Sequence, residues 1–156
     1  MAQKVKPIPD GYHTLTPYFV VGDAARAIDF YRRAFGATEL FRMPGPDGRI
    51  MHAEIQVGDS RLMLSDESPE MGSKSPATLK GTPVSLLLYV TDVDASFKQA
   101  VGAGAKEVAA PVDMFWGDRW ARVADPFGHE WQIATHKEDV PPEEMGKRAA
   151  AAFSEK

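Results

Sequence analysis

Two stretches of the chain repeat one order of hydrophobic and polar positions. Residues 18–40 read YFVVGDAARAIDFYRRAFGATEL, and residues 86–108 read LLLYVTDVDASFKQAVGAGAKEV. In each stretch an apolar run ends near an aspartate, apolar residues then recur at helical spacing, and a Gly-Ala pair follows. With one residue of slack, Asp23 aligns with Asp92 and Gly36 with Gly104. The pattern predicts one structural unit present twice, each copy beginning as strand, helix and glycine turn.

The helix of each copy is its clearest predicted element. Asp23 is a suitable N-cap, apolar residues recur behind it, and Gly36 stands where a left-handed C-cap is needed. In the second copy Asp92 or Asp94 takes the capping role. We predict helices over residues 24–35 and 93–103.

Strand-like segments follow the helix in each copy. They are β-rich or alternate polar and apolar residues, and the sequences GPDG and VGDS supply hairpin turns. Further short strands are expected directly after each Gly-Ala turn. The other predicted strands, including the two that open the copies, cover residues 14–21, 50–57, 61–65, 83–90, 119–124 and 130–135.

The predicted elements form one domain and a tail. A unit of one helix and about four strands buries its sheet face poorly, so the two copies are expected to share a core. Residues 68–80, rich in Ser, Pro, Gly and Lys, are the expected linker, and residues 138–156 a helical tail. We predict an α+β fold in which module one (11–67) and module two (81–137) form a single domain over residues 11–137.

Composition narrows the classes of function. The chain has 18 Lys and Arg against 22 Asp and Glu and no basic run that would track a phosphate backbone, so nucleic acid is not an expected partner. The absence of cysteine excludes disulfides, thiol nucleophiles and thiolate metal ligands. No stretch approaches the roughly 20 apolar residues that span a bilayer, and the first residues lack a signal-peptide core. We therefore expect a cytoplasmic protein without membrane contact.

The two βαβββ units resemble those of the vicinal oxygen chelate superfamily. The resemblance rests on TPYFVV, FYRRAFGA and MHAEIQVGDSRLMLSDE in the first copy and on WGDRWARVADPFGHEWQIATH in the second. The nearest branch is that of the PhnB-like glyoxalase/bleomycin resistance/dioxygenase proteins, and residues 116–136 are the most specific part. The resemblance implies that the modules curve into a cup-shaped sheet, that a small organic molecule binds in the cup, and that the chain forms a homodimer.

Alternation along the strands predicts which side chains face such a cup, because residues two apart share a face. The apolar positions 51, 53, 55 and 57 are expected against the first helix, which turns His52, Glu54 and Gln56 toward the cup. Trp131 and Ile133 of the last strand are expected to be buried under a helix. The other side chains expected to face the cup are Thr16, Tyr18, Met63, Ser85, Leu87, Tyr89, Glu130 and Gln132.

The resemblance also bears on a metal cofactor. Metal-dependent members such as glyoxalase I and the extradiol dioxygenases place His or Glu at the start of the first strand and near the end of the last strand of a module. The repeat puts Thr16, Met63, Ser85 and Gln132 at these positions. Thr, Ser and Met are poor ligands for a divalent ion, and one Gln does not hold it alone. The usual ligand set is not matched, and the cofactor stays unknown, with a relocated divalent-metal site as an alternative.

His52 and Glu54 are the strongest candidates for chemistry, because their spacing sets both side chains on one face of one strand. A neutral imidazole beside a carboxylate can act as a general base, bind a proton donor of the substrate, or supply two metal ligands. The alternative is structural, with the two side chains hydrogen-bonded to each other or to a neighbouring Arg on a solvated face.

Several residues of the second copy have a functional and a structural interpretation. Trp116 and Trp120 either stack on a flat ligand or pack in a dimer, whereas Trp131 is expected in the core. Asp118 and Arg119 are expected to form a local ion pair, and the DPFG run at residues 125–128 a tight turn.

Two functions follow from these expectations. The first is an enzyme of lyase or isomerase type, or one related to the dioxygenases, in which His52 and Glu54 handle a proton. The second is a protein that sequesters its ligand without chemistry, as bleomycin resistance proteins do. The residues expected to bind the substrate or ligand are Thr16, Tyr18, Met63, Trp116, Trp120, Glu130 and Gln132.

Overall fold

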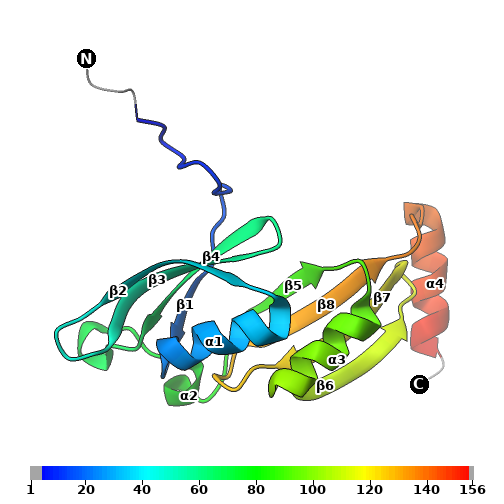
Figure 1. Cartoon of the computed structure of the whole chain (residues 1–156). Helices are drawn as coiled ribbons and strands as arrows, with labels where there is room; N and C mark the ends of the chain where they lie inside the picture. Colours follow the sequence, from blue (N-terminus) through cyan, green and yellow to red (C-terminus); the bar gives the residue numbers. More distant parts are fainter. Residues whose placement is uncertain (1–4, 155–156) are drawn as a thin grey trace. The chain divides into compact units, whose positions relative to one another are not determined.

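The computed structural model describes residues 5–154. The chain folds into two compact units, with the boundary between Gly81 and Thr82. We call the part up to Gly81 unit one and the part from Thr82 unit two. Each unit builds one four-stranded sheet with one long helix against it (Figure 1). The predicted α+β fold of two βαβββ modules with a C-terminal helix is confirmed.

Unit one follows the predicted order of elements. Its strands are β1 (Tyr18–Val21), β2 (Thr38–Pro44), β3 (Ile50–Val57) and β4 (Ser60–Asp66), and its long helix is α1 (Ala24–Phe35). The strands lie in the order β1-β4-β3-β2, with β1 parallel to β4 and the other pairs antiparallel. The segment after β4 carries the short helices η1 (Pro69–Met71) and α2 (Pro76–Leu79).

Unit two repeats this topology. Its strands are β5 (Ser85–Tyr89), β6 (Lys106–Asp113), β7 (Asp118–Ala124) and β8 (Glu130–His136), and its helix against the sheet is α3 (Val93–Ala103). The strands lie in the order β5-β8-β7-β6, again with the first and last strands parallel. The strands predicted after each Gly-Ala turn are β2 and β6. Both long helices have the predicted bounds, and the C-terminal helix is α4 (Pro142–Ser154).

One face of each sheet forms the core with its helix. Every second residue of the strands points toward the helix. These residues and the inner face of the helix are almost fully buried, as expected for one long helix packed on a sheet. In unit one the buried set includes Phe19, Val21, Ile28, Tyr31, Ala53, Ile55, Leu62 and Leu64. In unit two it includes Val93, Phe97, Ala100, Ala121, Val123, Trp131 and Ile133. The opposite face of each sheet, which we call the open face, lies away from α1 or α3.

Two predictions about the strands of unit one are wrong. The first strand begins at Tyr18 and not at residue 14, because Pro17 has no N–H to continue the ladder, although its carbonyl accepts from the Met63 N–H at 3.0 Å. Met51 was expected against α1 but is 57% exposed. Met51 is the second residue of β3, and its side chain lies against Gly45 of the β2–β3 turn.

A side chain from the last strand ties the start of the helix to each sheet. In unit one, Asp66 accepts from the N–H of Ala24 through Oδ1 and from the N–H of Ile50 through Oδ2, both at 2.6 Å. In unit two, the Thr135 hydroxyl accepts from the Val93 N–H at 2.9 Å and donates to the carbonyl of Val90 at 2.9 Å. Each side chain satisfies a backbone donor that a helix leaves free in its first turn.

The DPFG turn between β7 and β8 is confirmed, and Asp125 organises it. The Oδ1 atom of Asp125 accepts from the N–H groups of Phe127 and His129 at 2.9 Å, and its Oδ2 atom accepts from the indole of Trp131 at 3.0 Å. Trp131 lies in the core, as predicted, with only 1% of its surface exposed.

The C-terminal tail contacts the rest of unit two through an aromatic pair and through the backbone of Gly117. The ring of Phe153 in α4 lies 6.1 Å from that of Phe115, and within the tail Arg148 donates twice to the carboxylate of Glu138 at 2.8 Å. The carbonyl of Gly117 accepts from the N–H groups of residues 137 and 138, and a Cβ at Gly117 would lie 2.2 Å from the Glu138 carbonyl oxygen. Close backbone approach therefore requires glycine at this position.

Across residues 5–154, none of the helices has both the length and the apolar character needed to cross a membrane.

We expect Asp66→Ala to lower the free energy of unfolding by about 2–4 kcal/mol, because two backbone N–H groups from different elements lose one charged acceptor. Urea unfolding followed by circular dichroism measures the change. Asp29→Ala is the matched control, since this exposed carboxylate only pairs with Arg33 four residues on in α1, and it should cost no more than about 0.5 kcal/mol. Equal costs for the two variants would contradict the role given to Asp66.

Candidate functional site

The open face of unit one brings four of the predicted site residues together. In the strand register Tyr18 pairs with Met63, Met63 with Glu54, and Glu54 with Phe41, so these side chains form a row across all four strands. His52 lies two residues before Glu54 on the same face. The register thus confirms that Tyr18, His52, Glu54 and Met63 share one face of the sheet.

Hydrogen bonds connect the polar side chains of this row. The Tyr18 hydroxyl lies 3.0 Å from Nδ1 of His52, and Nε2 of His52 lies 3.2 Å from Oε1 of Glu54. The second carboxylate oxygen of Glu54 accepts from the hydroxyl of Tyr12, which precedes β1. We call Tyr12, Tyr18, His52 and Glu54 the tyrosine–histidine–glutamate network. Its members are each within reach of their neighbours, and both oxygens of Glu54 and both nitrogens of His52 have partners.

The negative charge of Glu54 sets the direction of each hydrogen bond in the network. The hydrogen bond from Tyr12 is the main cause that holds the pKa of Glu54 below its usual value of 4.5, and the bond to His52 adds to it. An ionised carboxylate only accepts, so Tyr12 donates to it and a neutral His52 donates from Nε2, which leaves Nδ1 to accept from Tyr18. Burial, and then the bond to Glu54, raise the pKa of Tyr12 above 10.0, so this phenol keeps its proton at neutral pH.

Arg61 completes this end of the open face. It precedes Met63 by two residues on β4, and its guanidinium carbon lies 4.5 Å from the centre of the Tyr12 ring. An arginine over a tyrosine ring gains a cation–π interaction. Within the described part of the chain, its Nε atom is buried without a hydrogen-bond partner. Gly11 passes close to the same guanidinium, since a Cβ there would lie 2.5 Å from one of its nitrogens.

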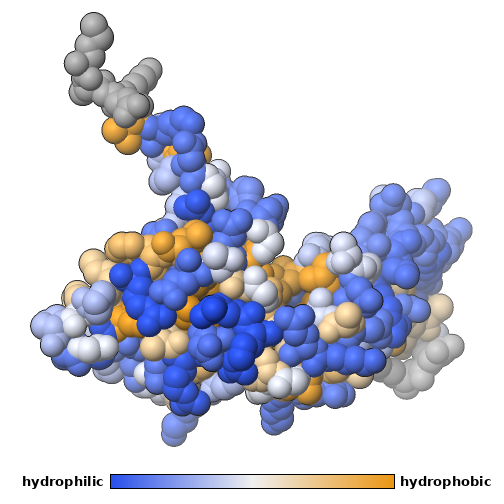
Figure 2. All heavy atoms as spheres, viewed as in Figure 1, coloured by the Kyte–Doolittle hydropathy of each residue, from blue (hydrophilic) through white to orange (hydrophobic). Residues whose placement is uncertain are grey.

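A pocket of about 480 Å³ lies beside this network. Glu54 and Met63 line it from the sheet, and the segment before β1 supplies the rest of its wall, namely Pro7, Ile8, Pro9, Tyr12, His13, Thr14 and Thr16. Thr16 is not in a strand as predicted but does line the pocket, and its hydroxyl donates to the carbonyl of His13 at 3.2 Å. Figure 2 shows hydrophobic surface on unit one beside the base of this segment. The volume is within the range of small-molecule sites.

The open face of unit two carries three more of the predicted site residues, Trp120, Glu130 and Gln132, on strands equivalent to β3 and β4. Ala53 pairs with Leu64 in unit one as Ala121 pairs with Ile133 in unit two. Trp120 and Arg122 therefore stand where His52 and Glu54 stand, and Gln132 stands where Met63 stands. The duplicated scaffold presents two chemically different faces.

The polar groups of this second face are also paired among themselves. The Trp120 indole donates to Oε1 of Gln132 at 2.8 Å, and the Gln132 amide donates to Oγ of Ser85 at 2.7 Å. Glu130 pairs with Arg122. Trp116 does not join this group but packs edge-on against Trp120, with ring centres 6.5 Å apart. Trp120 is thus held by one hydrogen bond and by one ring contact.

The expected ion pair between Asp118 and Arg119 is wrong, because neighbouring residues of a strand point to opposite faces. Asp118 faces away from α3 and accepts from the Tyr89 hydroxyl at 3.0 Å, with Nδ1 of His136 at 2.8 Å. Arg119 points to the other face, where it donates to both oxygens of Asp94 in α3 at 2.7 and 2.9 Å.

The positions at which a metal would be expected do not fit a divalent ion. The Gln132 oxygen already accepts from Trp120, its amide donates to Ser85, and Thr16 and Met63 offer no anionic ligand. His52 and Glu54 are only two ligands, and both are engaged in hydrogen bonds. Across residues 5–154 no group of three or more His, Asp or Glu side chains is arranged to hold a metal.

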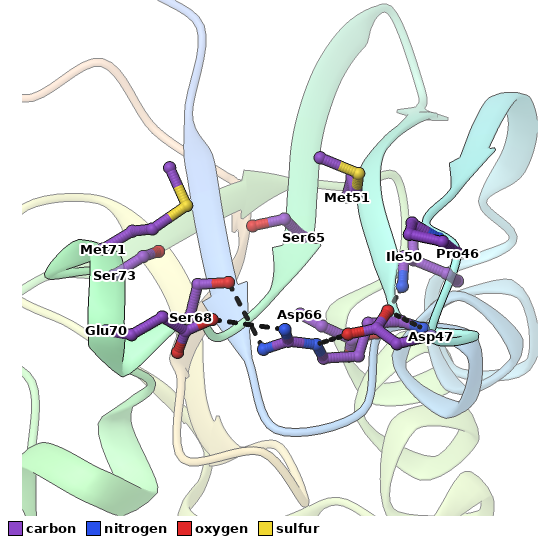
Figure 3. Close-up of a pocket in the computed structure, with 11 residues that line it drawn as sticks. Pro46, Asp47, Ile50, Met51, Ser65, Asp66, Ser68, Glu70, Met71 and Ser73 are labelled. Carbon is purple, nitrogen blue, oxygen red and sulfur yellow. Dashed lines mark hydrogen bonds and ion pairs between the residues drawn. The ribbon is translucent and has the colours of Figure 1, made fainter.

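A second pocket of unit one, of about 460 Å³, lies at the ends of β3 and β4 (Figure 3). Its Arg49 is held by Asp47 at 2.6 Å and by Glu70 at 3.2 Å, and Met51 and Met71 add exposed apolar surface. The Asp66 carboxylate in its wall is used by the backbone contacts described above. The charged groups of this pocket are thus paired within the fold.

Tyr12 and Arg61 are the site residues that sequence analysis missed. Tyr12 lies before the first strand, where strand alternation predicts no direction for a side chain. Arg61 was placed in a strand, and the alternation that turned Met63 to the cup also applied to it two residues earlier. The signal for Arg61 was therefore present, and none was present for Tyr12.

The sequence and the fold of this chain are similar to those of known proteins. Residues 12–133 match the family described as Glyoxalase/Bleomycin resistance protein/Dioxygenase superfamily. An uncharacterized protein of Mycobacterium bovis is 49% identical over 148 residues, which are 93% of this chain and 93% of that protein. Protein YjdN of Escherichia coli is 26% identical over 145 residues, which cover 80% of this chain and 96% of YjdN. The crystal structure of TioX from Micromonospora covers 80% of this chain and 98% of its own, with 30% identity and a TM-score of 0.65.

We expect Tyr12→Phe to raise the pKa of Glu54 toward 4.5, because the hydroxyl of Tyr12 is the main group that stabilises the ionised carboxylate. A pH titration of the Glu54 carboxyl carbon by NMR measures the shift. Tyr18→Phe is the control, since Tyr18 contacts His52 and not the carboxylate, and it should move the pKa of Glu54 much less. An unchanged Glu54 pKa in Tyr12→Phe would show that the contact does not persist in solution.

Proposed function

Because the chain belongs to the Glyoxalase/Bleomycin resistance protein/Dioxygenase superfamily, we propose that it binds a small organic molecule at the pocket on the open face of unit one. The observation that carries the proposal is the connection between that pocket and the tyrosine–histidine–glutamate network through Glu54 and Tyr12. Few polar groups set in an otherwise apolar wall are typical of small-molecule sites. Met63, Ile8 and two prolines supply the apolar part of the wall.

Binding without chemistry is the form of this function that the network supports best. Every donor of the network has an acceptor within it, so the network itself presents no unpaired base to the pocket. A wall that combines apolar side chains and the ring of Tyr12 with hydrogen-bonding groups recognises an amphipathic ligand and needs no reactive group. Sequestration of such a ligand requires only that the pocket bind it.

A lyase or isomerase type of enzyme is the second candidate, and one observation favours it. Tyr18, 50% exposed, lies at the outer end of a relay in which its hydroxyl contacts His52 and His52 contacts the ionised Glu54. His52 can take the Tyr18 proton while Glu54 stabilises the imidazolium, and the phenolate then serves as a general base toward a bound substrate. Tyr18 would be the group that touches the substrate, with His52 and Glu54 behind it.

We expect His52→Ala and Glu54→Gln each to weaken ligand binding about tenfold, because each breaks the hydrogen bonds that shape the pocket wall. A panel of aromatic and amphipathic molecules is screened by saturation-transfer NMR, and dissociation constants of the hits are measured by calorimetry. Gln56→Ala on the same strand face and Arg122→Ala in unit two are controls that should stay within about twofold.

Losses as large in the two controls as in His52→Ala would place the site elsewhere. The same samples are followed by NMR for conversion of the bound molecule. Turnover by the wild type that disappears in His52→Ala, with affinity changed less than tenfold, would select the enzyme over sequestration.

We also propose that the chain is a PhnB-like member of the superfamily and that it forms a homodimer. The run at residues 116–136 supports the branch, and exposed apolar side chains on the open face of unit two support a partner. Leu87 and Tyr89 on this face are 42% and 63% exposed. Light scattering after size exclusion should give twice the chain mass of 17.1 kDa, and a single chain mass at all concentrations would rule the dimer out.

A further inference from the structure

We infer that the pocket of unit one takes a small neutral phenol, and that the side chain of Tyr12 occupies the place of this ligand when the site is empty. The inference rests on the proposed function and names the chemical class of its ligand. Tyr12 brings a phenol ring and hydroxyl onto the open face from outside the sheet, since β1 begins only at Tyr18.

The contacts of Tyr12 are those that a bound phenol would make. Its ring lies under the guanidinium of Arg61, and its hydroxyl donates to the carboxylate of Glu54. The ring face attracts the cation, and the hydroxyl meets an ionised acceptor, so an aromatic ring and a proton donor are recognised together. The second oxygen of Glu54 is held by His52, which fixes the carboxylate that reads the hydroxyl.

A ligand takes the hydrogen bond that the Tyr12 hydroxyl makes to Glu54 only by replacing Tyr12. Both oxygens of Glu54 and both ring nitrogens of His52 already have partners. Of these partners, Tyr18 and the network residues on β3 belong to the sheet, and Tyr12 alone belongs to a segment outside it. The buried Nε of Arg61 has no hydrogen-bond partner within residues 5–154, so this side chain has unused binding capacity beside the Tyr12 ring.

The segment that carries Tyr12 is suited to move. Residues 5–11 are exposed and precede every strand, and the segment extends from unit one (Figure 1). Up to Thr16, its hydrogen bonds other than that to Glu54 are local, from Lys6 to Asp10, from the Tyr12 N–H to Pro9 and from Thr16 to His13, and the bond from the Met63 N–H to the Pro17 carbonyl marks where the segment joins the sheet. Release of Tyr12 thus breaks one charged hydrogen bond and one cation–π contact and leaves the sheet intact.

The charge of the site selects a neutral phenol over an aromatic acid. Glu54 is ionised at neutral pH and repels a carboxylate or phenolate brought to the same place, whereas a phenol donates its proton to it. The pocket of about 480 Å³ beside Tyr12 leaves room for substituents on the ring.

The test uses 4-methylphenol, which is the tyrosine side chain as a free molecule. We expect it to bind Tyr12→Ala at least about tenfold more tightly than the wild type, because the variant vacates the place between Arg61 and Glu54. Toluene, which lacks the hydroxyl, should bind the variant at least about tenfold more weakly than 4-methylphenol does. NMR titrations of the amide signals around Arg61 and Glu54 give both dissociation constants and report that each variant is folded.

Three further variants test separately the segment before β1, the hydroxyl of Tyr12 and the carboxylate of Glu54. Leu15→Ala, an exposed change in the same segment, should behave as the wild type. Tyr12→Phe keeps the ring but releases Glu54, so its affinity for 4-methylphenol should lie between those of the wild type and Tyr12→Ala. Glu54→Gln added to Tyr12→Ala should remove about tenfold of the gained affinity.

Equal binding of 4-methylphenol to wild type and Tyr12→Ala, or equal binding of toluene and 4-methylphenol to the variant, would overturn the inference. If Tyr12→Ala fails to bind 4-methylphenol but binds another class of molecule from the screen, the phenol assignment fails and the proposed function stands. If neither protein binds any molecule of the screen at this face, both fail.

Discussion

Each four-stranded sheet of this protein has one long helix to cover it, and this shortage of cover governs the rest of the structure. The helix buries one face almost completely, and the alternation of strand residues then puts every second side chain on the opposite face. Polar and aromatic residues are tolerated there because they are only half-buried and bond to one another. The open faces are therefore where recognition can develop without loss of the core.

The two open faces meet the same constraint with different chemistry. Unit one has an imidazole and a carboxylate two residues apart on its third strand, and unit two has an indole and a guanidinium at the equivalent positions. In both units these side chains are hydrogen-bonded to neighbours within the same unit, His52 and Glu54 to tyrosines in the first, and Trp120 to Gln132 and Arg122 to Glu130 in the second. A repeated backbone thus fixes where functional side chains stand, and the sequence of each copy decides what they recognise.

Sequence reasoning succeeded where a local rule governs the structure. Capping aspartates and glycines marked the bounds of α1 and α3, and alternation placed His52, Glu54 and Gln132 on their faces. It failed where contacts join distant or irregular segments. Tyr12 lies 42 positions before Glu54 in a segment that has no helical or strand periodicity. Asp118 is hydrogen-bonded to Tyr89 of another strand and not to its neighbour Arg119. Such pairs depend on the assembled sheet.

The irregular segment before β1 has a practical consequence for anyone who handles this protein. It lies next to the pocket of unit one, whereas α4 is the last helix of the chain and belongs to unit two. An affinity tag or fluorescent fusion joined ahead of Met1 would be attached to the irregular segment that carries Tyr12. One joined behind Lys156 would be attached to unit two and not to this segment. The choice of fusion end is itself a variable of any binding assay.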